Sequence, residues 1–394
     1  MGFIMRLKPT PASAEVRGED LPYDLAVYIG RFQPFHNGHL FCVRTALKYS
    51  RFLMIVIGSA NEARRPDYLP FTAQERQRMI EASLTEDERS RIVFKYSEDL
   101  GNTPLWAEQI QGLADEAVEE LGLWSLPGGP KITLVGHSKD KSSYYLKSFP
   151  MWDSVAVPPH EELSATPMRL VYFAPHADKV RGWLNTEGRK IMPDQVVNWL
   201  QDFMNTGAYE NLVAEWDNAV TYKAAWKDAP YAPIFSTVDG CLIHAGHVLL
   251  VERKARPGKG LWALPGGFLE QDEFIIDGCI RELREETKLR VPEAVLRGSL
   301  VATQVFDNPF RSMRGRTITH CHLFHLQPKA PEREKGETDA EYGLRLKAAF
   351  AHPKVKGMDD AAKAKWWPLD KVRRDMMFED HYLMIQTMKA KIQG

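Results

Sequence analysis

Two histidines three residues apart, His36 and His39, follow a short apolar segment in the stretch YIGRFQPFHNGHL. The segment Leu25–Gly30 has the composition of a strand, and a helical pattern of apolar residues begins directly after His39. The start of a helix presents unpaired backbone N–H groups and the positive end of the helix dipole. Imidazoles at this place, with Arg31 beside them, suit binding of phosphate oxygens and stabilisation of a leaving pyrophosphate. The alternative is that both histidines are surface residues of a loop.

A second candidate for anion binding is the stretch LSATPMR, which carries Ser164, Thr166 and Arg169. Proline suits the first position of a helix, so Pro167 predicts that Thr166 is the N-cap. The hydroxyl groups and Arg169 would then face an anion at this helix start. A capped helix with an unrelated arginine is the alternative.

Three carboxylates in the stretch GGFLEQDEFIIDGCIRELREETKL predict a metal site. On a helix, Glu282, Glu285 and Glu286 share one face, because they lie at positions i, i+3 and i+4. They repel one another, and a divalent cation would remove that repulsion. Hard oxygen ligands favour Mg²⁺, with Mn²⁺ also possible. The alternative is a solvated acidic face balanced by Arg281 and Arg284.

The elements that must position the histidines alternate between strands and helices. Phe52–Ala60 is a continuous apolar run of the kind found in a strand buried on both faces, and Thr72 with Glu75 forms a capping box at the next helix start. This alternation predicts a Rossmann-like, doubly wound α/β domain. Ligands of such sheets bind beyond the carboxyl ends of the strands. The strand-end pairs Gly58–Ser59 and Gly136–His137 should therefore lie in the same crevice as Gly30.

The length of 394 residues predicts two domains. A helical pattern beginning at Pro193 should stop at Gly207, and aromatic and polar residues follow it up to Pro230. Residues 328–356 should be an exposed insertion. We expect four segments: an N-terminal tail (1–21), a nucleotide-binding domain (22–205), a linker (206–229) and a second domain (230–394).

The overall composition excludes several classes of protein. Hydrophobic residues make up 44% and charged residues 26% of the chain, as in globular proteins, and the net charge of -1 predicts no general attraction to nucleic acid or membranes. No apolar run is long enough to span a bilayer, so the expected location is the cytoplasm. The four cysteines lie among apolar neighbours without a C-x-x-C pair, which predicts reduced, buried thiols.

The motifs of the first half resemble a known family. GRFQPFHNGH with SATPMR is similar to the nucleotidyltransferase superfamily with H-x-G-H and S-x-T-x-x-R signatures. With IGSA, PFTAQER and VGHSKDKSSYYLKSFP, the likeness narrows to the archaeal-type nicotinamide mononucleotide (NMN) adenylyltransferases, over roughly residues 24–200. The resemblance implies that ATP and NMN react to NAD and pyrophosphate by in-line attack on the α-phosphorus, without a covalent enzyme intermediate.

The same resemblance implies roles for individual residues. His36 and His39 would contact the ATP phosphates, Arg31 and Arg169 would hold the triphosphate, and Trp106 would lie against the nicotinamide ring. Stacking of a flat cation on an indole is favourable, although Trp106 also fits the core position of an amphipathic helix. The further residues that would bind substrate are Gly30, Phe32, Gly136, His137, Asp140, Ser164 and Thr166.

The spacing G-x5-E-x7-R-E-L-x-E-E that begins at Gly267 resembles the Nudix box. The resemblance covers about residues 230–394 and implies an α/β/α sandwich that hydrolyses a nucleoside diphosphate linked to another moiety. Metal ions on Glu282, Glu285 and Glu286 would activate water, while Glu273 and Arg281 would orient the ligands. Lys288 departs from the motif, because the family usually has glycine there. Candidates for the general base are Glu341, Asp359 and Asp360.

Chains that carry both motifs resemble the bacterial bifunctional NMN adenylyltransferase/Nudix hydrolases. This resemblance implies ADP-ribose as the second substrate, cleaved to AMP and ribose 5-phosphate. The stretch FDNPFRSMRGRTITH would contribute arginines to substrate recognition, Arg314 among them, together with Arg311 and Arg316. Alternatives are a Nudix domain that senses a nucleotide without hydrolysing it, or one that acts on another nucleoside diphosphate derivative. A homodimer or higher homo-oligomer is possible.

Overall fold

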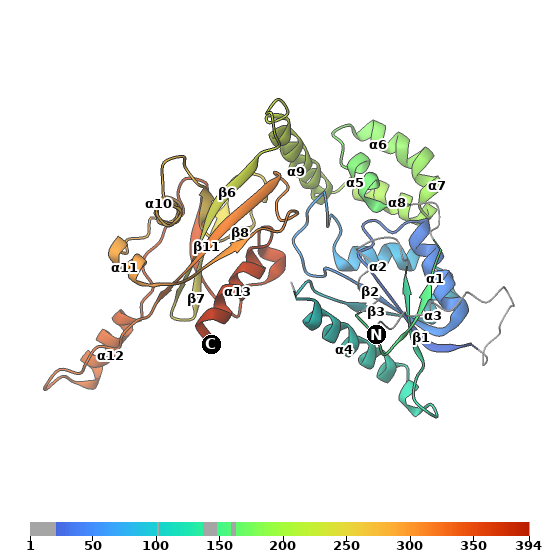
Figure 1. Ribbon diagram of the computed structural model, residues 1–394, viewed down its shortest axis with the longest axis horizontal. Coiled ribbons are helices and arrows are strands. Elements are labelled where there is room, and N and C mark those ends of the chain that lie inside the picture. The colour runs from blue at the N-terminus through green and yellow to red at the C-terminus, as the bar shows by residue number, and fades with distance from the viewer. Residues whose placement is uncertain (1–20, 101, 137–147, 159–162, 394) are drawn as a thin grey trace, which may run out of the picture. The chain divides into compact units, whose positions relative to one another are not determined.

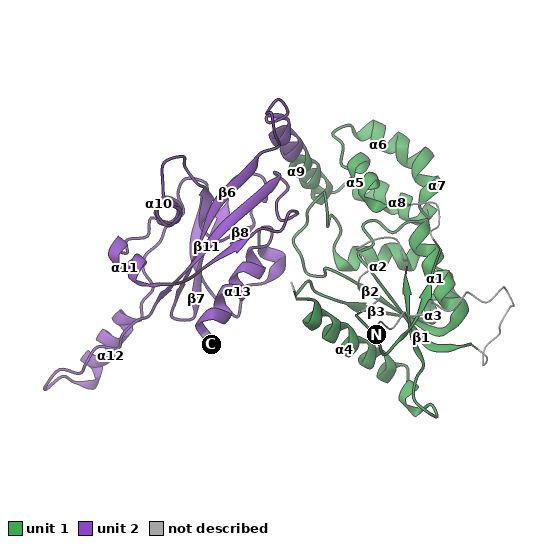
Figure 2. Ribbon diagram, in the orientation of Figure 1, with its two compact units in different colours: residues 1–216 green, residues 217–394 purple. Residues whose placement is uncertain are grey.

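The computed structural model describes residues 21–100, 102–136, 148–158 and 163–393 of the chain (Figure 1). It divides into two compact units, residues 1–216 and 217–394 (Figure 2). The division falls inside the segment 206–229, where the sequence analysis places the linker. Nearly all of the expected N-terminal tail lies outside the described residues.

The sheet of unit 1 is wholly parallel, with the strand order β3-β2-β1-β4-β5. The order runs outward in both directions from β1, as in doubly wound nucleotide-binding folds. The predicted Rossmann-like class is therefore confirmed. Its strands are β1 (Tyr23–Gly30), β2 (Ser50–Ile57), β3 (Ile92–Tyr96), β4 (Ile132–Gly136) and β5 (Asp153–Ala156).

Helices cover both faces of this sheet, because alternate residues of its strands point to opposite sides. Ala26 and Tyr28 pack in the cluster that includes α1, whereas Leu25 and Val27 pack in the cluster that includes α4. The capping box of Thr72 and Glu75 is present at the start of α2. The helices are α1 (Asn37–Tyr49), α2 (Ala73–Ala82), α3 (Glu86–Ser90), α4 (Thr103–Glu120), α5 (Ala165–Tyr172), α6 (Ala177–Trp183), α7 (Arg189–Ile191) and α8 (Asp194–Phe203), with short helical turns η2 (Leu123–Ser125) and η4 (Leu184–Gly188).

The segment after α8 corrects the sequence prediction. Gly207 does not end a helix but begins α9 (Gly207–Ala224), which occupies most of the expected linker. Tyr209 and Leu212 of α9 are buried in the core of unit 1. Their spacing, continued by Val213 and Trp216, is helical. The aromatic residues thus form a packed helix face, where the sequence analysis expects an irregular connection.

Unit 2 is an α/β/α sandwich, as predicted. Its mixed sheet has the path β10-β11-β6-β7-β12, with β8 beside β7 and β9 beside β6. Helix α10 covers one face and α13 the other (Figure 1). The elements are β6 (Ile234–His244), β7 (His247–Arg253), β8 (Trp262–Ala263), β9 (Gly266–Phe268), α10 (Ile275–Thr287), α11 (Glu293–Gly298), β10 (Leu300–Phe306), β11 (Arg316–Leu326), α12 (Asp339–Ala349), β12 (Ala361–Pro368), η5 (Arg374–Met376) and α13 (His381–Gln393).

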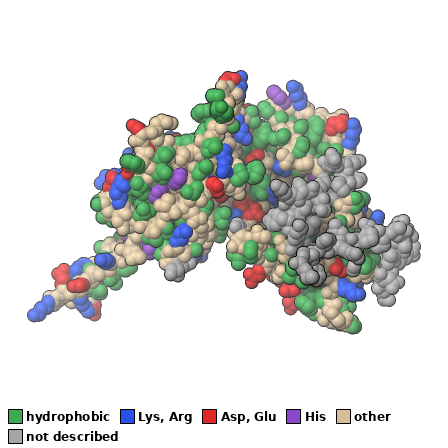
Figure 3. Space-filling model, viewed as in Figure 1, with side chains coloured by type: hydrophobic (Ala, Val, Ile, Leu, Met, Phe, Trp, Pro, Cys, Tyr) green, Lys and Arg blue, Asp and Glu red, His purple; other side chains and the backbone are tan. Residues whose placement is uncertain are grey.

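The expected insertion, residues 328–356, contains α12, which has no buried residue and extends away from the sandwich. Charged side chains of both signs gather on it (Figure 3). All four cysteines are buried and unpaired, as predicted. Within the described ranges, no helix combines the length and apolarity needed to cross a bilayer.

Candidate active sites

His36 and His39 lie together at the start of α1. His36 is the N-cap residue, and its backbone N–H donates to Nδ1 of His39 over 3.3 Å. The two rings stack with their centroids 3.7 Å apart. Because Nδ1 of His39 accepts a hydrogen bond, the proton of the neutral ring is on Nε2. This tautomer lets Nε2 donate to a phosphate oxygen at the helix start.

The backbone before α1 holds His39 in place through Phe32. Phe32 is buried with a left-handed φ of 52°, and its ring centroid lies 5.1 Å from that of His39. A Cβ atom on Gly30 would come within 2.7 Å of the Phe32 ring. Gly30 is therefore required by close packing, in addition to ending the strand.

Arg76 of α2 bonds to backbone that follows two strands, β1 and β2. It is not among the site residues predicted from the sequence. The side chain is 1% exposed and donates to the carbonyl oxygens of Arg31, Gly58 and Ser59 at 3.0, 2.6 and 3.2 Å. Burial, with a smaller effect of the Arg31 charge, lowers the pKa of Arg76 to about 10. A charged residue in the buried stripe of an amphipathic helix was the signal that could have identified it.

Arg169 lies against the loop that precedes α1. It is 8% exposed and donates to the Gln33 carbonyl at 2.8 Å and to the Thr166 hydroxyl at 3.1 Å. Burial and then the nearby Arg31 charge lower its pKa to about 10. Arg31 itself is exposed and stacks on the Tyr68 ring at 4.2 Å. The fold thus gathers positive charge beside His36 and His39, which suits an anionic ligand.

The start of α5 differs from the prediction. Ser164 is the N-cap and Thr166 lies inside the first turn, which places Pro167 third in the helix. Proline is tolerated there because the first-turn N–H groups have no partner within the helix. Instead of capping the helix, the Thr166 hydroxyl accepts the bond from Arg169.

Trp106 lies in the first turn of α4, at the carboxyl edge of the sheet. It is partly buried against the core, and its ring meets Phe149 edge-on at 5.8 Å. The core contact agrees with the alternative given for Trp106, and the contact with nicotinamide stays a prediction. Gly136 ends β4, as expected. His137 and Asp140 lie outside the described residues.

In unit 2, Arg281 gathers the carboxylates around the exposed face of α10. It donates to Glu273 at 2.8 and 3.0 Å, to Glu282 at 3.0 Å and to Glu285 at 2.9 Å. Beside this group, a Cβ atom on Gly267 would come within 2.4 Å of the Glu282 carboxylate. Gly267 therefore makes the room that this carboxylate occupies.

Glu286 bonds to Gly266 of β9, the neighbour of Gly267. It is 6% exposed, and Oε2 accepts a hydrogen bond from the Gly266 N–H at 3.0 Å. Burial raises the pKa of Glu286 to about 8, and the Glu282 charge adds to this rise. A cation beside these carboxylates would favour their ionised forms.

The three carboxylates fit a divalent metal in type, because all offer hard oxygen donors. As their side chains lie, however, no group of three His, Cys, Asp or Glu residues within the described ranges surrounds a common ion position. Arg281 bonds to Glu282 and Glu285, so an ion shared by all three carboxylates would require these two to rotate away from the guanidinium.

The three candidates for the general base lie in different surroundings. Glu341 caps its own helix, with Thr338 as the N-cap partner. Asp359 and Asp360 instead follow Met358, whose N–H donates to the Glu286 carbonyl at 3.0 Å. Only the latter two thus belong to a loop that contacts the end of α10.

The three arginines after β10 have different contacts. Arg311 is 5% exposed and forms two hydrogen bonds with Asp380, at 2.7 and 2.9 Å, so its guanidinium is held inside the unit. Arg316 pairs with Asp307. The guanidinium of Arg314 lies 5.1 Å from the centre of the Phe268 ring, beside the loop that leads to α10. Arg314 is therefore the best placed of the three for a ligand.

Lys288 ends α10 with φ 50° and ψ 30°, the left-handed conformation that glycine favours. We expect Lys288→Gly to raise the free energy of unfolding by up to about 1 kcal/mol, because relief of the left-handed strain exceeds the added entropy of the unfolded chain. Urea denaturation of unit 2, followed by tryptophan fluorescence, measures this. Lys288→Ala keeps the Cβ atom and should give no gain; equal gains from both variants would contradict the strain argument.

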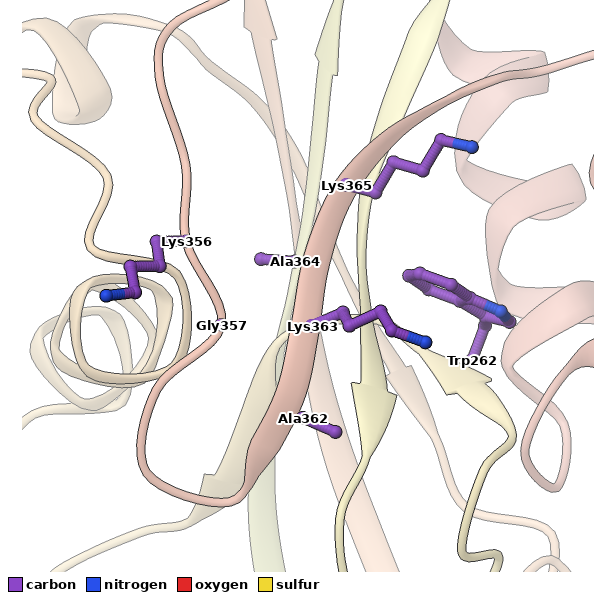
Figure 4. Close-up of a pocket in the computed structure, with 7 residues that line it drawn as sticks. All are labelled: Trp262, Lys356, Gly357, Ala362, Lys363, Ala364 and Lys365. Atoms are coloured by element: carbon purple, nitrogen blue, oxygen red, sulfur yellow. The ribbon is translucent and has the colours of Figure 1, made fainter.

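An open groove lies along β12 of unit 2. Its volume is about 560 Å³. Figure 4 shows the residues that line it. The groove contains none of the predicted site residues and is lined by Trp262, Lys356, Gly357, Ala362, Lys363, Ala364 and Lys365.

Comparison with protein families gives one match for each unit. Residues 27–112 match the cytidylyltransferase-like family, and residues 235–388 match the NUDIX domain. Among individual proteins, a nicotinamide/nicotinic acid mononucleotide adenylyltransferase of Acinetobacter baylyi is 37% identical over 194 residues, which cover 48% of this chain and 92% of that protein. An ADP-ribose pyrophosphatase of Methanocaldococcus jannaschii is 34% identical over 121 residues, which cover 30% of this chain and 68% of that protein.

A solved structure resembles the chain over nearly its whole length. It is the bifunctional NMN adenylyltransferase/ADP-ribose pyrophosphatase of Francisella tularensis complexed with AMP and a Mn ion. The TM-score is 0.77 at 34% identity, and the match covers 94% of this chain and 99% of that one. The order of the two units, the motif of each and this full-length likeness agree: the chain belongs to the family of bifunctional proteins that join an NMN adenylyltransferase to a Nudix ADP-ribose pyrophosphatase.

Proposed function

We propose that unit 1 transfers AMP from ATP to NMN, which gives NAD and pyrophosphate, and that unit 2 hydrolyses ADP-ribose to AMP and ribose 5-phosphate. The full-length likeness to the Francisella protein supports this most strongly. Incubation of the purified protein with ATP, NMN and Mg²⁺ should yield NAD, and incubation with ADP-ribose should yield AMP. Both reactions use soluble nucleotides, and we propose the cytoplasm as their location.

In unit 1, the positive groups at the start of α1 would bind the triphosphate. The imidazoles of His36 and His39 and the guanidinium groups of Arg31 and Arg169 would contact its oxygens. A phosphate oxygen of NMN then attacks the α-phosphorus in line, and the bond to the β-phosphate oxygen breaks. Fixed donors stabilise the charge that develops on pyrophosphate, so no covalent enzyme intermediate is needed.

Trp106 offers a test of how NMN is bound. If its indole stacks on the cationic nicotinamide ring, Trp106→Ala should raise KM for NMN by about 10-fold, as expected for a partly desolvated cation–π contact. KM for ATP should stay the same, and Trp106→Phe should restore most of the affinity. Steady-state kinetics with either substrate varied measures this. A fall in thermal stability without any change in KM for NMN would show that Trp106 is only a core residue.

In unit 2, Glu282, Glu285 and Glu286 would hold a divalent ion, for which we propose Mg²⁺, with Mn²⁺ as a substitute. Once bound, such an ion lowers the pKa of its water and offsets charge on the diphosphate. Glu273 fixes Arg281, which keeps the carboxylates close before the ion enters. Arg314 and Gly267 would contact the substrate, and Asp359 or Asp360 would accept the proton of the attacking water.

Removal of divalent metal should therefore abolish AMP formation from ADP-ribose. We expect dialysis against EDTA to lower the rate by at least about 100-fold, because the carboxylates alone cannot stabilise the diphosphate charge. Mg²⁺ or Mn²⁺ should restore it, whereas Na⁺ at equal ionic strength should not. Full activity of metal-free protein, with metal content verified by mass spectrometry, would contradict the metal assignment.

A further inference from the structure

Three histidines of unit 2 gather at the turn between β6 and β7, a place that neither proposed reaction uses. Ala245 and Gly246 form this turn with φ values of 46° and 73°, which places His244 and His247 opposite each other on the two strands. The third, His352, belongs to the segment that returns from α12. Its ring centroid lies 4.3 Å from that of His247 and 5.4 Å from that of His244.

Backbone carbonyls fix the protonation of two of these rings. Nδ1 of His244 bonds the Leu326 carbonyl at 2.9 Å, and Nδ1 of His247 bonds the Ala245 carbonyl at 2.9 Å. A carbonyl oxygen only accepts, so each Nδ1 carries a proton, and in the neutral ring Nε2 has the lone pair. A carbonyl partner on the distal nitrogen is the usual arrangement of a histidine that ligates a metal.

Two nitrogens of the cluster are buried without a hydrogen-bond partner among the described residues, Nε2 of His244 and Nδ1 of His352. His244 is 6% exposed, whereas His247 and His352 remain partly accessible. Leaving a buried polar atom without a hydrogen bond destabilises the folded state. An ion that entered from the solvent side would satisfy both nitrogens.

The third ring packs against its own neighbours. His352 stacks on Trp366 at 5.3 Å with an angle of 17° between the rings, and the Trp366 indole N–H donates to the Pro353 carbonyl at 2.9 Å. Leu242 and Leu249 pack in the same cluster as Trp366. His244 lies two residues after Leu242 and His247 two residues before Leu249, so both histidines are on the face of the sheet that carries Trp366. All three imidazoles therefore point into one region.

We propose that His244, His247 and His352 bind a transition-metal ion of the Zn²⁺ class, at a site separate from the carboxylates of α10. Imidazole favours Zn²⁺, Ni²⁺ and Cu²⁺ over Mg²⁺. Zn–N bonds of about 2.0–2.1 Å place two ligand nitrogens roughly 3.4 Å apart in tetrahedral geometry, which these rings reach by turning. The side chains must rotate to bind the ion, because no three ligand groups within the described ranges already surround an ion position.

The ion would join the β6–β7 turn to the segment that leads towards the proposed hydrolytic site. That segment is anchored at α10 by the N–H groups of Lys356 and Met358, which donate to Thr287 and Glu286 carbonyls at 2.8 and 3.0 Å. Binding would therefore stabilise unit 2 and order the return from α12. The inference does not depend on the substrate of either unit.

The test is Zn²⁺ titration of the full-length protein in excess Mg²⁺, which occupies hard oxygen sites. Wild type should bind one equivalent of Zn²⁺ more than His352→Gln and His247→Gln do. If the variants still bind that equivalent, their affinity for Zn²⁺ should be lower by at least about 100-fold, the upper range for loss of a contact that supports a metal ligand. His176→Gln, an exposed histidine of unit 1, is the matched control and should bind as wild type does. Co²⁺ in place of Zn²⁺ should give a visible absorption band that the two cluster variants lack.

Folding is checked independently by circular dichroism and by AMP formation from ADP-ribose in Mg²⁺ alone, which both cluster variants should retain. Zn²⁺ should also raise the midpoint of thermal unfolding of unit 2 in wild type but not in the variants. Equal Zn²⁺ stoichiometry and affinity in wild type, His352→Gln and His247→Gln would overturn the proposal.

Discussion

Replacing His39 by alanine is expected to lower kcat for NAD formation by about 100- to 1,000-fold, the range for loss of one donor that stabilises transition-state charge. The reason is geometric, because Nδ1 of His39 accepts the His36 N–H and leaves the proton on Nε2 for a phosphate oxygen. Packing of the ring against Phe32 and Phe35 fixes this direction. The measurement is the initial rate of NAD formation at saturating ATP and NMN.

The second unit supplies an internal control for this variant. AMP formation from ADP-ribose should be unchanged in His39→Ala, since α1 belongs wholly to unit 1. His176→Ala removes an exposed histidine of the same unit and should affect neither reaction. If His39→Ala lost both activities, or neither, the assignment of adenylyl transfer to the start of α1 would be wrong.

Glu286→Gln should show the reverse pattern. We expect ADP-ribose hydrolysis to fall by at least about 100-fold, because the amide keeps the shape of the side chain but lacks the charge that holds a divalent ion. In metal-free protein the variant should be at least as stable as wild type, since a buried carboxylate is replaced by a neutral group. Loss of activity would then report on the metal site and not on folding.

The matched control is Glu293→Gln, which removes an exposed carboxylate of α11 that pairs with Arg297. It should leave hydrolysis unchanged. Metal affinity from titration with Mn²⁺, followed by its electron paramagnetic resonance, separates binding from turnover. Wild-type Mn²⁺ affinity in Glu286→Gln, with full hydrolytic activity, would remove Glu286 from the site.

The two reactions are chemically related through their products. ADP-ribose is what remains of NAD after nicotinamide is lost, so unit 2 would remove a breakdown product of the compound that unit 1 makes. This relation explains why one chain of this family carries both units, and it requires no contact between their sites.

Features that depend on nearby residues could be predicted from the sequence. The capping box of Thr72 and Glu75 depends only on helical spacing, and it occurs in the structure. Glu282, Glu285 and Glu286 all lie on α10 as predicted, but Glu282 and Glu285 bond to Arg281, whereas Glu286 bonds to Gly266. The order of strands and helices in unit 1 likewise follows from local apolar periodicity. These elements place the histidines at the start of α1 and the carboxylates on α10.

Features that depend on distant residues could not be predicted in the same way. Arg76 bonds carbonyls at the ends of two other strands, and Arg311 pairs with Asp380 far along the chain. The N-cap at Ser164 and the helix after Gly207 were missed for another reason, because proline and glycine favour several neighbouring positions about equally. Tertiary packing selects among them.

The most direct test of the proposed function uses the purified protein with Mg²⁺ in parallel reactions. One contains ATP and NMN and is assayed for NAD; the others contain ADP-ribose, NADH, ADP-glucose or diadenosine polyphosphates and are assayed for AMP. We expect NAD in the first reaction and AMP only in the reaction that contains ADP-ribose. NAD formation without hydrolysis of any of these compounds, or hydrolysis without NAD formation, would contradict it.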